Sequence, residues 1–311
     1  MALVLDSRMV VIRANRAARD FFEIAPESLP DSLIILTREL RVEAAIRHGG
    51  DLHSEIRLVH RPATLQVTVV PGLASGELVA FLSDLTELRR LQTVRQEFVA
   101  NLSHELRTPI TSLRLAAESL GGELADSARK RFAARALKEA DHLAAIVDNL
   151  RQLAEIEAGK RAVRRTRFDL AELVTEVGRR IGVDRTVKVE VVEGLLLHAD
   201  REKLAQALSN LIDNAAKFSP VDAPVEVRAE LRETEYAISV RDHGPGISPE
   251  HWDRIFERFY KVDPARSREM PGSGLGLAIT KHLVLLMGGR VWTEAAADGG
   301  QVFALALPAE P

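Results

Sequence analysis

The chain has no cysteine among its 311 residues. This absence excludes disulfide bonds, thiolate metal sites and a thiol nucleophile, and it is typical of a reducing compartment. Long apolar runs are also missing, because no stretch approaches the roughly 18 residues that a membrane span requires. The N-terminus has no basic region followed by an apolar segment, so no signal peptide is visible. We therefore expect the chain to be cytoplasmic. A cytoplasmic fragment of a longer, membrane-anchored protein would have the same features.

An excess of positive charge is absent as well. The 42 lysine and arginine residues face 45 aspartate and glutamate residues, so the net charge is −3. This balance provides no general field that would attract nucleic acid. Hydrophobic residues at 46% and charged residues at 28% describe a globular rather than a disordered protein. The length suggests about two or three domains.

The first part of the chain combines short strands and helices. Strand-like runs occur at residues 3–6, 9–14, 54–59, 64–70 and 77–83. Asn15 can cap a helix that ends at Phe22, and a second helix near Thr37–His48 should stop at Gly49-Gly50. The sequence therefore predicts a small α+β domain.

The order of these elements resembles that of PAS sensor domains, and Asp84-Leu85-Thr86 lies where that family often has a closing Asp-x-Thr motif. The alternative is a small α+β domain of no particular family. His48, His53 and His60 could supply a haem ligand, but ordinary surface histidines are the more common case. Flavin–cysteinyl photochemistry is excluded because the chain lacks cysteine.

Two long amphipathic helices are expected next, over residues 86–120 and about 126–158. In both, apolar residues recur at three- and four-residue steps, and Gly121-Gly122 separates them. Asp126 or Ser127 can cap the second helix. Because a hairpin of two such helices cannot bury its broad apolar face alone, the sequence predicts a dimeric four-helix bundle.

The most informative segment lies in the first of these helices, where residues 98–110 read FVANLSHELRTPI. His104 stands beside Glu105 and off the apolar stripe, so its side chain should face solvent. Pro109 has no N–H to bond the carbonyl of Glu105, and its ring crowds that carbonyl, which loosens the helix beside the histidine. A histidine next to a glutamate is common on solvated helix faces, and this pair gains weight only together with three segments downstream.

The last part of the chain alternates helices and strands. Helices are expected from Asp169 to about Ile181, from Asp200 to Phe218 and from Leu275 to Met287. Strands are expected at residues 187–193, 224–231, 236–242, 290–295 and 301–307. Because neighbouring strands follow each other without helical crossovers, we predict an α/β sandwich with a mixed or antiparallel sheet and helices on one face.

Polar residues on the helix that begins at Asp200 form the first of the three segments. Asn210, Asn214 and Lys217 lie at i, i+4 and i+7, and hence on one face. Two amide oxygens and an ammonium group suit a magnesium–phosphate group, because Mg²⁺ prefers oxygen ligands and keeps substrate phosphates. The alternative is a solvated polar face, which two asparagines within a helix make less favourable.

The second segment follows a strand end, where Asp242 precedes His243-Gly244-Pro245-Gly246. A carboxylate there can accept a hydrogen bond from an exocyclic amino group such as that of adenine, and the glycines let the backbone approach a ring closely. Taken alone, this segment is only a favourable turn. Ser248-Pro249-Glu250 then predicts the start of a helix that carries residues 255–260, IFERFY.

The third segment is the glycine-rich run at residues 272–277, GSGLGL, which directly precedes a helix. Backbone N–H groups at such a helix start bind phosphate. No strand of a βαβ unit leads into the run, so it is not a dinucleotide fingerprint, and it lacks the Gly-Lys-Ser/Thr ending of a P-loop. Residues 261–270 before it form a charged stretch that we expect to be a loop.

Taken in order, these motifs resemble those of one family. NLSHELRTPI, NLIDNAAKFS, DHGPG, IFERFY and GSGLGL are similar to the H, N, G1, F and G2 boxes of sensor histidine kinases of the HisKA type, over roughly residues 85–308. The run that begins at Asp263 is similar to the lid of the phosphate-sensing branch. Lys261 departs from the family pattern, where arginine is frequent, so the cation that meets the γ-phosphate stays open.

The resemblance implies a role for each matching residue. His104 would attack the γ-phosphate of MgATP, Glu105 would orient the ring and accept its proton, and Asn210 and Asn214 would hold Mg²⁺. Thr108 would position water for dephosphorylation of a response regulator, whose aspartate receives the phosphoryl group. The implied ATP site comprises Asn210, Asn214, Lys217, Phe218, Asp242, Gly244, Gly246, Lys261, Gly272, Gly274, Leu275, Gly276 and Leu277.

The predicted domains are a PAS-like sensor domain at residues 1–84, a dimerisation and phosphotransfer hairpin at 85–160 and an ATP-binding domain at 161–311. Two alternatives belong to other classes. A catalytically dead dimeric scaffold would have lost a residue of the ATP site, and none is lost. A chaperone-like or gyrase-like ATPase would have no histidine segment upstream.

Overall fold

The computed structural model describes residues 1–47, 54–74, 76–122, 125–157, 162–180, 187–191, 194–263 and 272–309. They form two compact units, residues 1–99 and 100–311, and the boundary falls inside the long helix α4. Within the described residues, no helix combines the length and the apolar character needed to cross a membrane.

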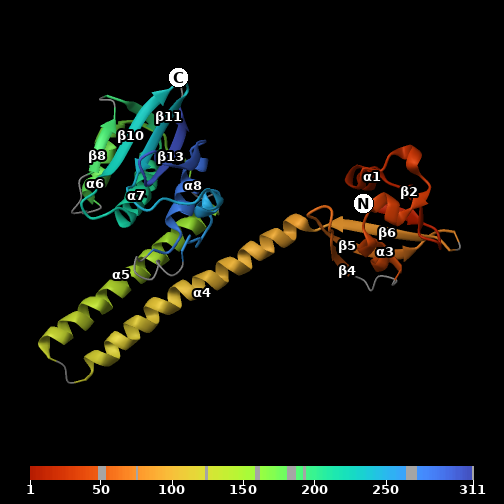
Figure 1. The fold of residues 1–311 in the computed structure, drawn as a ribbon, viewed down its shortest axis with the longest axis horizontal. Helices are drawn as coiled ribbons and strands as arrows, with labels where there is room; N and C mark the ends of the chain where they lie inside the picture. The colour runs from red at the N-terminus through yellow and green to blue at the C-terminus, as the bar shows by residue number, and fades with distance from the viewer. Residues whose placement is uncertain are drawn as a thin grey trace. The chain divides into compact units, whose positions relative to one another are not determined.

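The first unit contains a six-stranded antiparallel sheet in the order β3-β2-β1-β6-β5-β4, with its helices inserted between β2 and β4 (Figure 1). The elements are β1 (Ala2–Leu5), β2 (Val10–Ala14), α1 (Arg16–Phe22), the 3₁₀ turn η1 (Pro26–Ser28), β3 (Asp31–Ser32), α2 (Leu33–Thr37), α3 (Leu40–Arg47), β4 (Ser54–Arg57), β5 (Thr64–Pro71) and β6 (Leu78–Asp84). Alternate strand residues such as Leu3, Leu5, Leu65 and Val67 are fully buried beneath the helices. The predicted α+β fold of this region is confirmed.

The predicted start of one helix in this unit was wrong. We expected a helix near residues 37–48, but two helices occur, because Arg38 adopts a left-handed conformation with φ 55° and ends α2. The expected stop at Gly49-Gly50 lies outside the described residues, as do His48 and His53. Asn15 caps α1 as predicted, since its side chain accepts the N–H of Ala18 at 2.9 Å.

The Asp-x-Thr motif joins the end of the sheet to the start of α4 (Thr86–Leu120). The N–H of Thr86 donates to Asp84 Oδ1 at 2.9 Å, and the hydroxyl of Thr86 accepts the N–H of Thr64 on β5 at 3.0 Å. Arg89, one turn into the helix, pairs with Glu55 on β4. The first turn of α4 is therefore bonded to three strands of the sheet, β4, β5 and β6.

The second unit begins with the predicted helical hairpin, α4 and α5 (Asp126–Glu157). α4 continues through Pro109, whose ring is buried. The carbonyl of Ala125 accepts the N–H groups of Ala128 and Arg129, so Asp126 is the first residue of α5 rather than its cap. Ser112 links the two helices, because its hydroxyl donates to Glu139 at 3.1 Å.

An apolar face of the hairpin is exposed in the single chain. Ile110 and Leu115 on α4 are 52% and 57% exposed, and Leu137 and Val147 on α5 are 67% and 59% exposed. Several large apolar side chains exposed on one face normally indicate an interaction surface.

The rest of the second unit is a five-stranded sheet in the order β12-β13-β11-β10-β8, covered by helices (Figure 1). Of the two sheet types that the sequence left open, mixed and antiparallel, the sheet is mixed. Only the β10–β8 pair is parallel among the described strands. The elements are β7 (Thr166–Asp169), α6 (Leu170–Arg180), β8 (Val187–Val191), β9 (Leu196–Ala199), α7 (Arg201–Phe218), β10 (Val225–Arg232), β11 (Glu235–Arg241), η2 (Pro249–His251), η3 (Arg254–Phe256), α8 (Gly276–Leu286), β12 (Arg290–Ala295) and β13 (Gln301–Pro308). One apolar core lies between sheet and helices.

Two features of this unit differ from the prediction. The short strands β7 and β9 pair with each other and were not expected. The helix expected after Ser248 is instead two 3₁₀ turns, η2 and η3. Ile255 and Phe256 are buried in the core, and the indole of Trp252 donates to the carbonyl of Ile247 at 2.9 Å, so tertiary contacts override the local helix signal.

A buried ion pair at the start of α7 binds the segment at residues 162–164, which precedes β7. Lys203 Nζ lies 2.6 Å from Asp200 Oδ2 and donates to the carbonyl of Ala162 at 3.0 Å, while the N–H of Arg164 donates to Asp200 at 2.9 Å. Burial raises the pKa of Asp200, but the hydrogen bonds from Lys203 and from Arg164 outweigh it, and the pKa lies below its usual value.

Candidate active site

α7 presents the predicted polar face beside a buried apolar one. Leu204, Leu208, Leu211 and Ala215 are at most 2% exposed and pack into the core. Asn210 and Asn214 are half-buried on the other side, and Lys217 is exposed and pairs with Asp213. The helix therefore places two amides and one ammonium group along a single solvent-reaching face, as the spacing predicted.

Asn210 is oriented by the start of α8. Its amide nitrogen donates to the carbonyl of Gly276 at 3.1 Å and lies 3.4 Å from the hydroxyl of Thr280, which itself donates to Gly276 at 3.0 Å. Because the NH₂ group is committed to α8, the amide oxygen is the atom left to act as an acceptor or cation ligand. The site thus joins α7 to the glycine-rich segment.

Asp242 lies at the end of β11 and is only 4% exposed. Its Oδ1 accepts the N–H of Gly244 at 2.8 Å and that of Gln301 at 3.1 Å. Burial raises the pKa of Asp242, and these two hydrogen bonds offset only part of that effect. A carboxylate kept in place despite its burial is characteristic of a binding site, and Oδ2 is the oxygen not used by the backbone.

Glycines surround this carboxylate because side chains would not fit. A Cβ at Gly244 would lie 2.9 Å from the carbonyl oxygen of Phe218, and Gly246 has φ 76°. Gly300, at φ 89°, is more constrained still, since a Cβ there would lie 2.0 Å from the carbonyl oxygen of Asp242. The backbone segments around Asp242 are therefore packed so closely that only glycine fits at positions 244 and 300.

The glycine-rich segment packs against the F region. The carbonyl of Gly274 accepts the N–H of Phe259 at 2.9 Å, and at φ 68° a Cβ on Gly274 would lie 2.8 Å from the Cα of Phe259. Leu275 is fully buried and stands at the N-terminal cap of α8, and Leu277 packs against the core. Among the described residues, no heavy atom lies within 4 Å of a Cβ built on Gly272. The first N–H groups of α8 have no partner within the helix and can bind phosphate.

Glu105 on α4 contacts the ATP-site segment directly. Its Oε1 lies 2.6 Å from Lys261 Nζ, and both side chains are about one-fifth exposed, at 23% and 21%. His104 faces solvent, as predicted. The hydroxyl of Thr108 is also exposed and donates to the carbonyl of His104 over 3.4 Å, which is a long hydrogen bond.

The structure thus brings most of the predicted ATP-site residues together, in two separate groups. Asn210, Gly276 and the glycine-rich segment form one, and Asp242 and Gly244 form the other, whereas Lys261 contacts α4. Phe218 is 45% exposed beside the second group.

Sequence reasoning missed three residues of this site. Gln301 is 1% exposed, bonds Asp242 through its backbone, and accepts the N–H of Ile247 with its side chain at 3.0 Å. Thr280 supports Asn210, and Gly300 makes room for Asp242. Only the Gly299-Gly300 pair gave a visible signal, since paired glycines before a strand indicate a constrained turn.

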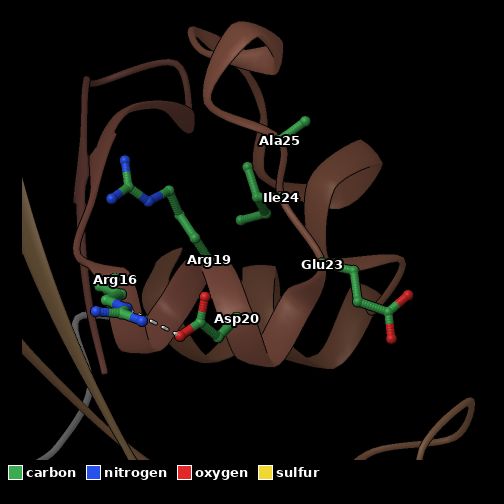
Figure 2. Close-up of a pocket in the computed structure, with 6 residues that line it drawn as sticks. All are labelled: Arg16, Arg19, Asp20, Glu23, Ile24 and Ala25. Atoms are coloured by element: carbon green, nitrogen blue, oxygen red, sulfur yellow. Dashed lines mark ion pairs between the residues drawn. The ribbon is translucent and has the colours of Figure 1, made fainter.

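Other polar sites in the described residues do not resemble a catalytic centre. Figure 2 shows an open hollow over α1 in the first unit, lined by Arg16, Arg19, Asp20, Glu23, Ile24 and Ala25. Its charges partly pair with each other, since Arg16 and Asp20 lie 3.7 Å apart. No cluster of three or more histidine, aspartate or glutamate side chains suited to a metal ion occurs among the described residues. His60 is exposed, which fits a surface histidine.

Two sequence models of protein families match the chain. The model described as histidine kinase-, DNA gyrase B- and HSP90-like ATPase matches residues 199–311, and the His Kinase A (phospho-acceptor) domain matches residues 94–159. The second match contains His104 and the first contains the α7, Asp242 and glycine-rich segments.

Similar proteins have been named as sensor kinases. The sensor-like histidine kinase SenX3 of Mycobacterium tuberculosis is 34% identical over 99% of this chain and 77% of its own length. The sensor histidine kinase WalK of Bacillus subtilis is 33% identical over 74% of this chain and 39% of its own length.

Solved structures are similar in fold as well. Full-length ShkA in complex with AMPPNP is 29% identical, with a TM-score of 0.51 over 69% of this chain and 46% of that chain. Histidine kinase ThkA in complex with the response regulator protein TrrA has a TM-score of 0.57 over 100% of this chain and 96% of that chain; at 21% identity it shows similarity of fold alone.

Proposed function

The chain belongs to the sensor histidine kinases of two-component systems, and on that premise we propose which residues carry its activity. The family membership means that the chain binds ATP, transfers the γ-phosphoryl group to one of its own histidines and passes it to an aspartate of a response regulator.

His104 is the phosphorylated histidine. A ring nitrogen of its exposed imidazole attacks the γ-phosphorus, the bond to the β–γ bridging oxygen breaks, and ADP leaves with the electron pair of that bond. Glu105 accepts the proton that the ring loses. The observation that carries this assignment is the 2.6 Å contact of Glu105 with Lys261, because it brings the turn that bears His104 to the ATP-binding domain.

ATP is held by the two groups described above. Asp242 Oδ2 accepts the adenine amino group, Phe218 borders the ring, and Gly244 and Gly246 leave room for it. The first turn of α8 with Gly272, Gly274, Leu275, Gly276 and Leu277 faces the phosphates, and Lys217 and Lys261 supply positive charge.

Mg²⁺ fits the donor set of α7. The amide oxygens of Asn210 and Asn214 are hard ligands of the kind that Mg²⁺ takes together with phosphate and water, and the ion would neutralise phosphate charge. The amide nitrogen of Asn210 is already bonded to Gly276, so its oxygen is the atom available to a cation.

We assign a sensor domain of PAS type to residues 1–84, a dimerisation and phosphotransfer hairpin to 85–160 and the ATP-binding domain to 161–311. The exposed apolar residues of the hairpin support a homodimer through a four-helix bundle. The element order of the sheet and the Asp84–Thr86 cap support the PAS assignment. Deleting residues 1–84 should leave ATP binding intact, and loss of binding would contradict these boundaries.

The assignment of His104 is tested by labelling the purified chain with γ-labelled ATP and Mg²⁺. His104→Ala should abolish the label, whereas His142→Ala on the same hairpin should keep it. The label should be lost in acid and survive base, as a phosphoramidate does. Normal labelling of the His104→Ala variant would show that another residue is phosphorylated.

A further inference from the structure

The contact between Lys261 and Glu105 joins residues that are 156 positions apart and that the reaction needs for other tasks. Glu105 must accept a proton from the histidine ring, and Lys261 must meet a phosphate. At 2.6 Å, the ammonium group of Lys261 occupies Oε1 of Glu105. In this arrangement the ammonium group of Lys261 must leave the carboxylate before it can meet a phosphate, and its charge makes Glu105 a weaker base while the pair is formed.

The position of Lys261 brings it close to where the phosphates bind. It follows Phe259 by two residues, and the N–H of Phe259 donates to the carbonyl of Gly274 in the glycine-rich segment at 2.9 Å. A terminal phosphate carries a charge of about −1.5 to −2, more than the single charge of a carboxylate. ATP therefore competes with Glu105 for the same ammonium group.

Lysine suits such an exchange better than arginine does. Its ammonium group is a point charge on a flexible four-carbon stem, whereas a guanidinium holds a carboxylate through two parallel hydrogen bonds. The pair is also partly shielded, since each side chain is only about one-fifth exposed, at 21% and 23%, so bulk water does not fully screen it.

We propose that Lys261 couples nucleotide loading to activation of the base: it holds Glu105 in the nucleotide-free chain and releases it when the γ-phosphate arrives. This inference rests on the proposed role of Glu105. Nucleotide binding must then break the pair, so removing the carboxylate charge makes binding tighter, provided that Lys261 is present.

The test is equilibrium binding of a non-hydrolysable ATP analogue to the full-length chain, which requires no phosphoryl transfer. Glu105→Gln should tighten binding by about 1.5- to 5-fold, the range expected for a partly exposed ion pair. In a Lys261→Met background the same substitution should change nothing. Glu118→Gln is the matched control, because Glu118 on α4 pairs with Arg114 at 2.9 Å within its own helix.

Unchanged affinity of the Glu105→Gln variant would overturn the exchange, and so would a gain that persists with Lys261→Met or equals that of Glu118→Gln. The proposed base role fails separately. If Glu105→Gln labels His104 at the wild-type rate, Glu105 is not the base, whatever the binding result.

Discussion

Replacing Asp242 by asparagine should weaken ATP binding while strengthening the fold. Asparagine can keep its amide oxygen at the position of Oδ1, where the N–H groups of Gly244 and Gln301 need an acceptor. Its NH₂ group then takes the place of Oδ2. A donor would face the adenine amino group where the wild type presents an acceptor, so the variant loses the bond that reads the base.

The magnitude follows from the kind of bond lost. A hydrogen bond to a charged group contributes about 1.5–3 kcal/mol, which corresponds to about 10- to 150-fold in affinity. The same NH₂ group matches the carbonyl oxygen that guanine carries in place of the adenine amino group. GTP binding should therefore fall less than ATP binding, or rise.

The stability of the variant changes in the opposite direction. Because burial raises the pKa of Asp242 above its unfolded value, the folded chain binds more protons than the unfolded chain between the two pKa values. The contribution of Asp242 to wild-type stability therefore falls as the pH rises through this window, and the ionised carboxylate costs free energy at neutral pH. Asp242→Asn removes this cost, and its advantage should shrink as the pH falls below the raised pKa.

Calorimetric ATP titration and urea unfolding at several pH values measure both effects. Asp242→Ala is the contrasting variant, because it leaves the N–H groups of Gly244 and Gln301 without an acceptor, at about 1–3 kcal/mol each. It should lose both binding and stability. An asparagine variant that binds ATP with wild-type affinity would refute the role of Oδ2.

Three further outcomes are expected. Asn214→Ala should lose Mg²⁺-dependent ATP binding and labelling with an unchanged unfolding midpoint, and wild-type affinity for MgATP would rule out the metal role. Thr108→Ala should keep His104 labelling but dephosphorylate the response regulator about 100-fold more slowly, the low end of what a positioned proton-transfer group contributes; equal losses of both rates would indicate that Thr108 only shapes the turn before Pro109. Leu106→Glu should give monomer or aggregate in light scattering, whereas a wild-type chain that is itself monomeric at micromolar concentration would contradict the dimer.

Periodicity and capping predicted the parts of the fold that are set locally. The three-residue polar face of α7 follows from helical spacing, and Asp200 begins that helix because its side chain accepts the N–H of Lys203 at 3.1 Å. The exposure of His104 follows from its place off the apolar stripe. These features depend on residues within one or two turns of each other, which is why a single sequence suffices.

The remaining features depend on contacts between distant segments. Gln301 could not be assigned to the site from its own neighbourhood, since its partner Asp242 lies on another strand. The pairing of Lys261 with Glu105 likewise depends on how the ATP-binding domain rests on the hairpin. The two 3₁₀ turns in place of a helix arise where Ile255 and Phe256, neighbours in the chain, are both buried in the core.

Position 300 should accept no residue other than glycine, although it lies outside the five motifs that resemble the histidine kinase boxes. Any side chain would place its Cβ 2.0 Å from the carbonyl oxygen of Asp242 and would push aside the strand end that carries the adenine-reading carboxylate. A mutational scan should therefore find that every substitution at Gly300 weakens ATP binding. When copies of this chain diverge after duplication, loss of nucleotide recognition can begin at that glycine, while all the motif residues are still intact.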